Sequence, residues 1–375
     1  MLRSSGRDTG ERGNVKIIVI GAGVAGLSIG WRLAQKGASV TVLDRAQPAR
    51  GASWAAAGMI AATAEAGEAD TPQAELAHHA RSLWPDFARE IESASGKRIA
   101  YSQPGSLLVA TNEAEAAHFA ERARAANDLT WLSKDEARAM EPMIAHTVHG
   151  ALLAAKEAQV DNRALGAALA RCFVRAGGTL IANEAVVRIE VDRGRAFAVR
   201  TPFGYREADA FVLAAGAWSG EIGGLPREAV PPVKPMKGEM LALKPGAGAA
   251  LPARMVWGHE VYLVPRGKRL LIGATLEDAG FDTAVTDAAE DWLSSRALAL
   301  MPALRDWTID EHWAGLRPGS PDGLPMLGES AVSGLFIASG QYRNGILFAP
   351  AIAEILSRSV LERSPGPKAF DPRRF

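Results

Sequence analysis

The beginning of the chain combines a glycine-rich turn with the elements that usually surround one. An apolar, β-branched run at 15–20 leads directly into 21–26, which reads Gly-Ala-Gly-Val-Ala-Gly. A helical stretch follows over 27–36, and a second β-branched run at 39–43 ends at Asp44. A strand, a G-x-G-x-x-G turn, a helix, a strand and an acid in this order are typical of a dinucleotide-binding unit on a buried parallel sheet. The chain is therefore predicted to have an α/β fold that starts with a Rossmann-like unit.

Each part of this unit has a physical reason for its residue type. Gly21 permits a tight turn, Gly23 lets a pyrophosphate approach the backbone, and Gly26 lets the helix pack on the strand. The free N–H groups and the partial positive charge at the helix N-terminus attract phosphate, and Asp44 is placed to accept hydrogen bonds from ribose hydroxyls. A lone G-x-G-x-x-G is a weak signal in a chain with 38 glycines, but here the flanking elements are in register with it.

The order of elements leaves NAD and FAD open, and three later stretches favour FAD. Small residues follow the second strand at 53–59, an apolar strand ends in small residues at 210–219, and another strand at 334–340 leads into an apolar helix. Such scattered pieces predict a discontinuous nucleotide domain, whereas single NAD-binding domains are usually contiguous. The sequence has no second G-x-G-x-x-G and no CxxC, so electrons are expected to enter from the substrate.

The composition argues against several other classes of protein. Lysine and arginine total 42, as do aspartate and glutamate, so no broad electrostatic footprint for nucleic acid or anionic lipid is expected. Cys172 is the one cysteine, which excludes intramolecular disulfides and cysteine-based zinc sites, and no metal site is predicted. No apolar run reaches the length of a membrane span, and the polar residues 1–14 are predicted to be a disordered tail. We expect a cytoplasmic protein that binds neither nucleic acid nor a membrane.

Four motifs give the chain a likeness to a known family. They lie at 21–26, at 55–59 (Ala-Ala-Ala-Gly-Met), at 313–323 (Trp-Ala-Gly-Leu-Arg-Pro-Gly-Ser-Pro-Asp-Gly) and at 343–350 (Arg-Asn-Gly-Ile-Leu-Phe-Ala-Pro). Together they resemble the D-amino-acid-oxidase-like FAD-dependent oxidoreductases, and most closely the bacterial glycine oxidases that supply thiazole synthesis in the thiamine pathway. The likeness covers residues 16 to about 361. The second and third motifs are its specific parts, since many flavoproteins share the first.

The resemblance implies two intertwined domains, a Rossmann-like FAD-binding domain and a substrate-binding domain whose antiparallel sheet forms a roof over the flavin. The strand-like runs 260–265 and 269–275 support the roof independently, because the short Arg-Gly-Lys connection between them signals a hairpin. Residues 231–238 are interpreted as a loop that enters a further strand at 239–243. The expected division is 15–85, 151–222 and 318–365 for the FAD-binding domain, and 86–150 and 223–317 for the substrate-binding domain.

Three residues are expected at an amino-acid substrate. Arginine binds both oxygens of a carboxylate through its planar fork, and Arg317 matches the family's carboxylate-binding arginine. Tyr262 matches the second carboxylate contact, and Arg343 falls at a turn near substrate and flavin. The resemblance implies that the α-hydrogen leaves as hydride to flavin N5 without a general base. It also implies that O2 reoxidises the flavin to give hydrogen peroxide, and that water hydrolyses the imine.

The resemblance further implies how FAD is held. The attachment cysteine of relatives with covalent flavin has no match, since Cys172 lies in the helical stretch 164–176 where a buried thiol is expected. Noncovalent FAD is therefore predicted. The residues expected at FAD are Gly21, Gly23, Val24, Ala25, Gly26, Asp44, Arg45, Ser53, Ala56, Ala57, Gly58, Met59, Val186, Gly216, Trp218, Asn344, Gly345, Ile346 and Leu347.

Three pocket positions depart from the better-known glycine oxidases. Glu260 stands where a histidine is familiar, Trp257 where a tyrosine is, and Leu276 where a methionine is. Glu260 is two residues before Tyr262 and is therefore expected on the same strand face. These changes leave the substrate open among glycine, sarcosine and small D-amino acids. The alternative enzyme is a dehydrogenase that passes electrons to a quinone or a partner flavoprotein, and in either case a homo-oligomer is expected.

Overall fold

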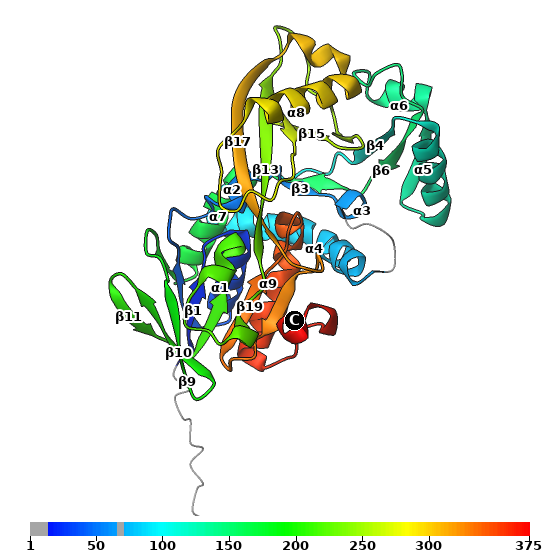
Figure 1. The fold of residues 1–375 in the computed structure, drawn as a ribbon. Coiled ribbons are helices and arrows are strands. Elements are labelled where there is room, and N and C mark those ends of the chain that lie inside the picture. The colour runs from blue at the N-terminus through cyan, green and yellow to red at the C-terminus, as the bar shows by residue number, and fades with distance from the viewer. Residues whose placement is uncertain (1–13, 66–70) are drawn as a thin grey trace, which may run out of the picture.

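A six-stranded sheet forms the centre of the lower half of the molecule in Figure 1. The computed structural model describes residues 14–65 and 71–375, and the expected tail at 1–14 lies outside them except for Asn14. Neighbouring strands are parallel, apart from an antiparallel strand at one edge. The spatial order is β18 (Met326–Glu329), β19 (Leu335–Ser339), β12 (Ala210–Leu213), β1 (Lys16–Ile20), β2 (Ser39–Leu43) and β8 (Thr179–Ile181).

Helices bury one face of this sheet and a small sheet buries the other. The core on the helical side joins strand residues such as Val19 to helix residues such as Leu27, Trp84 and Phe348. The core on the opposite side joins residues such as Ile18 to a three-stranded antiparallel sheet. The helices are α1 (Val24–Gln35), α4 (Pro72–Ser95), α7 (Asn162–Arg175) and α9 (Gly345–Glu362), and the small sheet is β9 (Arg188–Asp192), β10 (Arg195–Thr201) and β11 (Gly204–Glu207).

The unit predicted at the N-terminus is confirmed. β1 and β2 pair in parallel from Lys16 to Ile20, and α1 begins directly after the glycine turn. Gly37 has a φ of 87° and follows the C-cap of α1, a position where the lack of a Cβ favours glycine. The strand expected within 210–219 lies beside β1, and the strand expected at 334–340 lies on the other side of that strand in the same sheet. The α/β fold and the discontinuous nucleotide domain are therefore as predicted.

A second, eight-stranded sheet forms the roof above the first (Figure 1). Its two longest strands, β13 and β17, pair along their whole length and reach from the lower half to the top of the molecule. The predicted hairpin is confirmed, because Tyr262 pairs with Gly273 and Arg266 with Arg269. The spatial order is β17 (Thr308–Gly319), β13 (Lys234–Lys244), β16 (Arg269–Gly273), β15 (Tyr262–Arg266), β14 (Met255–Trp257), β4 (Ser106–Ala110), β6 (Gly150–Ala154) and β5 (Leu129–Ser133).

The roof differs from the expectation in two details. The loop expected at 231–238 ends earlier, because β13 begins at Lys234 and pairs there with Gly319 of β17. The sheet is antiparallel except at one junction, where β14 and β4 run in parallel. This junction joins two stretches of chain that are far apart in the sequence.

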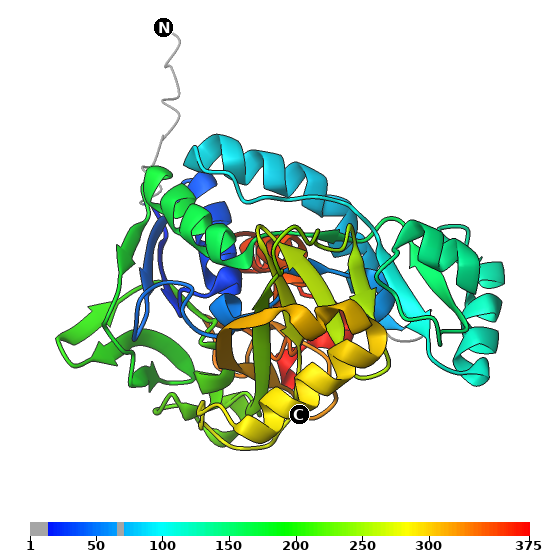
Figure 2. The ribbon, with the colours of Figure 1, turned by 90° about the horizontal axis from the view of Figure 1, so that it is seen from above.

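Three helices belong to the roof, at different places on it. Figure 2 shows α8 lying across the sheet and α5 and α6 at its far end. The core beneath α8 includes Leu241, Leu263, Ile272 and Leu293. The bounds of the helices are α5 (Glu113–Ala125), α6 (Lys134–Met140) and α8 (Asp287–Leu300).

The structure moves the expected domain boundaries. α4 runs without interruption through 85/86, and its second half packs into the core of the first sheet through Phe87 and Ile91. β6 starts at Gly150 and pairs with β4 and β5, so the boundary expected at 150/151 falls inside the roof. β17 likewise continues past 317/318. A continuous helix and a hydrogen-bonded ladder each act as one unit, so α4 goes with the nucleotide domain, and β6 and the end of β17 go with the roof.

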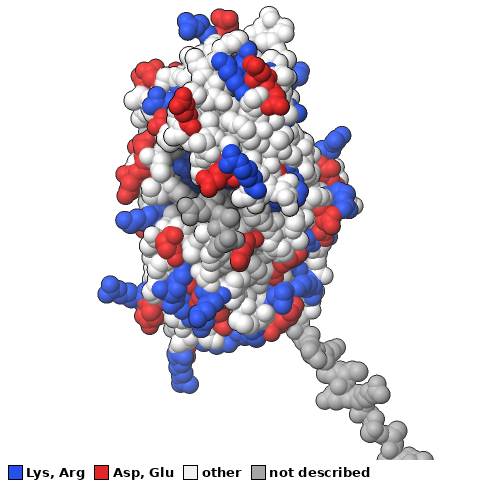
Figure 3. All heavy atoms as spheres, turned by 90° about the vertical axis from the view of Figure 1, so that its right-hand side faces the viewer, with Lys and Arg blue, Asp and Glu red and all other residues white. Residues whose placement is uncertain are grey.

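Short elements connect these units. No helix in residues 14–65 and 71–375 combines the length and apolar character that crossing a membrane requires. On the face drawn in Figure 3, basic and acidic side chains are interspersed without a large patch of either sign. The short elements are α2 (Ala52–Ala55), β3 (Met59–Ile60), α3 (Ala62–Glu65), β7 (Ala158–Gln159), η1 (Gly216–Glu221), η2 (Arg227–Ala229), η3 (Pro302–Asp306), η4 (Lys368–Phe370) and η5 (Pro372–Arg374).

Candidate active site

A cavity of about 700 Å³ lies where the two sheets meet. Its lining comes from the glycine turn after β1, from the chain between β2 and α3, from the end of β12, from roof strands β13, β15 and β17, and from the turn before α9. Every residue that the sequence placed at FAD or at the substrate lines this cavity, except Gly26. Stretches that are far apart in the sequence therefore share one space.

The glycine turn forms one end of the cavity. Gly21 has a φ of 104°, and a Cβ at this position would collide with the carbonyl oxygen of Ala214 after β12. A Cβ at Gly26 would overlap the carbonyl oxygen of Gly21, so Gly26 allows α1 to pack on the turn, and it is not among the residues that line the cavity. The N–H of Val24 donates to Oγ of Ser53 at 2.9 Å and joins the turn to the next cavity segment.

Asp44 is held in place at the end of β2. Its two carboxylate oxygens accept hydrogen bonds from the N–H groups of Ala22 at 2.7 Å and Ala46 at 2.9 Å. Each oxygen keeps a further lone pair for a ligand hydroxyl. Burial raises the pKa of Asp44, although the two amide donors and Arg45 oppose the rise. The Arg45 guanidinium lies 3.5 Å from the centre of the Trp218 ring, so a cation and an aromatic face stack beside the carboxylate.

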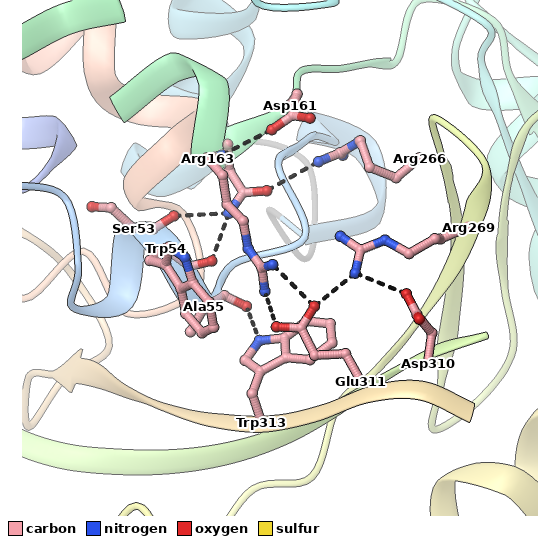
Figure 4. Close-up of polar contacts among 11 residues, drawn as sticks. Ser53, Trp54, Ala55, Asp161, Arg163, Arg266, Arg269, Asp310, Glu311 and Trp313 are labelled. Atoms are coloured by element: carbon pink, nitrogen blue, oxygen red, sulfur yellow. Dashed lines mark hydrogen bonds and ion pairs between the residues drawn. The ribbon is translucent and has the colours of Figure 1, made fainter. Parts of the chain in front are cut away.

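The segment 53–57 lines the cavity with mostly small side chains, and its carbonyl groups are held by other parts of the chain (Figure 4). At the start of α7, Nδ2 of Asn162 donates to the carbonyl oxygens of Ser53 and Trp54, both at 2.9 Å. Asn162 is buried, so both of its amide hydrogens are used in a place that water does not reach. This arrangement fixes the path of the segment along the cavity.

Two roof residues, Trp313 and Arg266, hold the next carbonyl groups of this segment, and Figure 4 shows the bond between Trp313 and Ala55. Nε1 of Trp313 on β17 donates to the carbonyl oxygen of Ala55 at 3.0 Å, and Nη2 of Arg266 on β15 donates to that of Ala57. Nη1 of Arg266 also donates to Oδ1 of Asn162 at 3.0 Å. Arg266 is 8% exposed, and burial lowers its pKa to about 10. The roof and α7 together therefore support the cavity wall, a role of Arg266 that no sequence motif indicated.

An ion-pair chain extends this support between α7 and the roof (Figure 4). Arg163 binds Glu311 through both terminal nitrogens, at 2.8 and 3.0 Å, and Nη1 of Arg269 contacts Glu311 at 2.7 Å and Asp310 at 3.3 Å. Hydrogen bonds from Arg163, and then from Arg269, hold the pKa of Glu311 below its ordinary value. The Arg163 guanidinium also lies 3.8 Å from the centre of the Trp54 ring. The pattern was invisible in the sequence because Arg163 and Glu311 are 148 residues apart.

Tyr262 and Arg317 lie at the roof end of the cavity, each over a glycine of a neighbouring strand. A Cβ at Gly273 would collide with the phenol of Tyr262, and a Cβ at Gly238 would collide with the guanidinium of Arg317. Glycine inside a strand often marks a place where another group must approach closely. Nη1 of Arg317 donates to the carbonyl oxygen of Thr275 at 3.1 Å, which fixes the guanidinium. Burial raises the pKa of Tyr262, so its hydroxyl keeps its proton at neutral pH.

A carboxylate that the sequence reasoning missed lies at the same end. Glu65, the last residue of α3, lines the cavity together with Arg317 and Arg343. Burial raises the pKa of Glu65, while the charges of Arg343 and Arg317 oppose the rise. The turn that carries Arg343 is tied to the end of β17, because the N–H of Tyr342 donates to the carbonyl oxygen of Pro318 at 3.0 Å. The one signal for Glu65 in the sequence is that it is the first acid after the alanine-rich motif at 55–59.

The three positions that depart from familiar glycine oxidases lie in different surroundings. β15 begins at Tyr262, so strand alternation does not extend back to Glu260, and the expectation that both share a face is wrong. The Glu260 carboxylate instead bonds Arg296 of α8 at 2.5 Å. Leu276 is 47% exposed and lies outside the cavity lining. Only Trp257 touches a described site residue here, with its ring centre 5.2 Å from that of Tyr262.

The residues around the cavity fit a dinucleotide. The N-terminus of α1 faces one end, and Gly58 and Gly216, with φ of 74° and 56°, line the wall without side chains. Near the turn before α9, Nε2 of Gln341 and Oδ1 of Asn344 are buried without a partner among the described residues. Both residues line the cavity, so these atoms are available to a bound molecule. Within 14–65 and 71–375, no three His, Cys, Asp or Glu side chains gather as a metal site.

The family match agrees with this cavity. Residues 16–359 match the family described as FAD dependent oxidoreductase, DAO. The chain therefore belongs to the DAO family of FAD-dependent oxidoreductases, and FAD is its cofactor.

Its relatives within the family include glycine oxidases. A glycine oxidase from Geobacillus kaustophilus is 35% identical over 367 residues, which cover 96% of this chain and 95% of the relative. A bifunctional ThiO/ThiG protein from Synechocystis sp. is 36% identical over 367 residues, which cover 96% of this chain and 54% of the relative. The chain thus spans about half the length of that bifunctional protein. The crystal structure of glycine oxidase from Geobacillus kaustophilus matches with a TM-score of 0.88 and 34% identity, over 96% of this chain and 97% of the other.

Proposed function

We propose that the protein is an oxidase of small amino acids that acts on glycine or a related amine, namely sarcosine or a small D-amino acid. The observation that carries this proposal is the pairing of Arg317 and Tyr262 at the roof end of the FAD cavity, each over a glycine that leaves it room. The planar guanidinium of an arginine can donate two hydrogen bonds to a carboxylate, and a phenol hydroxyl can donate a third. The similarity to glycine oxidases supports the same substrate class.

When bound, FAD supplies a ring that accepts a hydride and passes two electrons on to oxygen. The protein's own part is to bind and orient the substrate. Arg317 receives both carboxylate oxygens, and Tyr262 donates a hydrogen bond from a hydroxyl that burial keeps protonated. With the carboxylate fixed at two points, the α-carbon has one orientation in the cavity, which supplies much of the rate enhancement. The amine enters in its neutral form, so no side chain is assigned as general base.

Glycine, O2 and water are converted to glyoxylate, ammonia and hydrogen peroxide. Loss of the α-hydrogen as hydride and of a proton from nitrogen leaves the imine. Water adds to the imine carbon and ammonia departs, which gives glyoxylate. Oxygen takes up the two electrons with two protons and becomes hydrogen peroxide. We also propose that the imine feeds thiazole formation in thiamine biosynthesis, a role supported by relatives in which the ThiO part is joined to ThiG.

The cofactor is proposed to be noncovalent. Cys172 is 1% exposed inside α7 and is not among the residues that line the cavity, and burial raises the pKa of its thiol to about 11. A buried, protonated thiol is unsuited to form a bond with the flavin. Acid precipitation of the purified protein should therefore release all flavin into the supernatant as FAD, and flavin retained in the pellet would contradict the proposal.

The function is tested by assays with two acceptors. The purified holoenzyme is offered glycine, sarcosine and D-alanine, and hydrogen peroxide is measured beside the reduction of an artificial dye. We expect peroxide with at least one of the three substrates, and loss of activity in Arg317→Ala with the flavin spectrum retained. Dye reduction without peroxide would replace the oxidase by the dehydrogenase alternative. Absence of activity with both acceptors would refute the proposed substrate class.

A further inference from the structure

We propose that Glu65 determines substrate specificity: its carboxylate compensates Arg343, so that the cavity accepts amines with one carboxylate and disfavours amines with two. This inference rests on the proposed function and deepens it. It concerns three charged groups that line one cavity, Glu65 at the end of α3, Arg317 on β17 and Arg343 in the turn before α9. The proposed function uses Arg317 for the substrate carboxylate and assigns no task to Glu65.

The charges of these three groups decide what the cavity can take. With Glu65 ionised, the two guanidinium groups and the one carboxylate sum to a single positive charge, which one substrate carboxylate neutralises. A second carboxylate would find Arg343 already compensated and would face the charge of Glu65 itself. Like charges brought together in a poorly solvated site repel each other strongly. The same cavity without the Glu65 charge would instead offer a second guanidinium to a second carboxylate.

Glu65 is held at the cavity by a buried carboxylate behind it. Glu157 is 0% exposed, and its Oε1 accepts hydrogen bonds from the N–H groups of Thr63 at 2.7 Å and Ala64 at 3.0 Å. Nη2 of Arg122 on α5 donates to the carbonyl oxygen of Thr63 at 3.1 Å. The single turn of α3 is therefore fastened from two sides. Glu157 acts as a positioning residue for Glu65, because releasing Thr63 and Ala64 would free the turn that carries it.

The strand pairing next to α3 points to the same role. β3 and β7 pair through Met59 with Gln159 and Ile60 with Ala158, directly before α3 on one side and directly after Glu157 on the other. The cavity wall and the turn that bears Glu65 are thereby joined to one short ladder. The short ladder and the hydrogen bonds to Glu157 thus hold Glu65 at the cavity that Arg317 and Arg343 also line.

The protonation state of Glu65 decides whether the cavity discriminates against a second carboxylate. The groups that face Glu65 are Arg343, Arg317 and, from β15, Tyr262, whose pKa is itself raised. Burial raises the pKa of Glu65 above its ordinary value, so lowering the pH protonates it before an ordinary glutamate. Protonated Glu65 no longer compensates Arg343. Discrimination against a second carboxylate should therefore grow as the pH rises and fade as the pH falls.

The test measures equilibrium binding and does not depend on turnover. Glycolate and diglycolate carry one and two carboxylates and have oxygen where the substrates have nitrogen. Each is titrated into the holoenzyme, and the change in the visible flavin spectrum gives its Kd. The decisive quantity is the ratio of the diglycolate Kd to the glycolate Kd, compared between the wild type and Glu65→Gln. Glu121→Gln, an exposed exchange on α5 with the same change of charge, is the matched control.

We expect Glu65→Gln to lower this ratio by about tenfold or more at neutral pH, and Glu121→Gln to leave it unchanged. Because burial raises the pKa of Glu65, the ratio should rise with pH in the wild type and stay level in Glu65→Gln. Glu157→Ala should lower the ratio in the same direction, whereas Glu157→Gln keeps an acceptor oxygen for the amides of α3 and should stay near the wild type. A purely structural role of Glu157 would change stability and leave the ratio alone.

The outcomes separate this inference from the proposed function. If glycolate does not perturb the wild-type spectrum, the carboxylate site fails and this inference fails with it. If glycolate binds normally but the ratio is the same in the wild type and Glu65→Gln at every pH, the assignment of Glu65 is overturned while the proposed function stands. Kinetics with glycine and iminodiacetate extend the comparison to turnover, and kcat/KM for iminodiacetate should gain relative to glycine in Glu65→Gln.

Discussion

Nε1 of Trp313 donates a hydrogen bond to the carbonyl oxygen of Ala55 at 3.0 Å, across 258 residues of sequence. The bond joins the two most specific motifs of the chain, the one at 55–59 and the one at 313–323. Trp313 is buried beside Ala55, so the motif tryptophan supports the wall of the FAD cavity from the roof side. The two motifs are therefore parts of one structure, and a substitution in either should change the affinity for FAD.

The first prediction concerns this bond. Trp313→Phe keeps an aromatic ring but leaves the buried carbonyl of Ala55 without its donor. Such a loss costs about 1–3 kcal/mol. We expect a fall of that size in the free energy of unfolding, measured with denaturant, together with weaker FAD binding measured by flavin fluorescence. Trp292→Phe on α8 is the control, since Trp292 does not line the cavity, and equal effects of both exchanges would contradict the role of the hydrogen bond.

The second prediction ranks the two carboxylate contacts. Arg317→Ala removes a charged, bidentate partner and should lower kcat/KM by about 2–5 kcal/mol in transition-state stabilisation. Tyr262→Phe removes one neutral hydrogen bond and should cost about 1 kcal/mol. Steady-state kinetics on the preferred substrate measure both, and the visible spectrum checks that FAD is retained. Near-normal efficiency in Arg317→Ala would remove the main support for an amino-acid substrate.

The third prediction uses the glycines beneath these side chains. Gly238→Ala places a Cβ in collision with the Arg317 guanidinium, and Gly273→Ala places one against the Tyr262 phenol. Because the arginine contact is the stronger one, Gly238→Ala should lower kcat/KM more than Gly273→Ala, mainly through KM. Carboxylate inhibitors should bind more weakly in the same order, with FAD affinity unchanged. A loss of FAD in either variant would show that the glycines serve the cofactor instead.

The fourth prediction concerns cofactor affinity. Asp44→Ala removes the proposed partner of the adenosine ribose and also the acceptor of the Ala22 and Ala46 amides. FAD binding should weaken by about 1–3 kcal/mol, as expected for hydrogen bonds to a charged group. Turnover should return when FAD is in excess, because Asp44 lies at the nucleotide end. Asp192→Ala, an exposed exchange on β9, should leave the Kd for FAD as it is.

The fifth prediction is a pH dependence of stability. Arg163 and Arg269 hold the pKa of Glu311 below its ordinary value in the folded protein. The unfolded chain therefore binds a proton to Glu311 at a higher pH than the folded protein does. The stabilisation by Glu311 is fully present above the ordinary glutamate pKa of about 4.3 and is lost as the pH falls through the lower folded value. The difference in unfolding free energy between wild type and Glu311→Gln should shrink below about pH 4, and a constant difference would contradict the ion-pair chain.

The sequence-based predictions were most accurate for elements that depend on residues close together in the sequence. The turn at 21–26, its helix and the two strands lie within one short stretch, and their periodicity and glycines indicate the fold directly. The roof hairpin was predicted for the same reason. Arg317 and Tyr262 came from the family likeness, because nothing local separates them from other arginines and tyrosines.

The residues that support the site from behind could not be predicted from local sequence patterns. Arg266 is 209 residues from the carbonyl group of Ala57 that it holds. Glu65 gains its place from Glu157, whose carboxylate lies 94 residues from the Thr63 amide that it accepts. Such contacts depend on how the two sheets pack against each other. The hydrophobic periodicity of the sequence does not predict that packing. The domain boundary expected at 85/86, inside α4, was wrong for a related reason. The residue composition of a helix does not show which sheet the helix packs against.

β19 and α9 are synthesised near the end of the chain, yet β19 pairs with β12 in the first sheet and α9 packs with α1 in the same core. On the ribosome, the glycine turn and Asp44 emerge hundreds of residues before the strand and the helix that complete their surroundings. Until then β12 has an open edge and α1 exposes the apolar side that α9 will cover. Unpaired edges and exposed apolar surface make such intermediates prone to aggregate. The cavity that the glycine turn and Asp44 line is therefore completed only when the last part of the chain has been made.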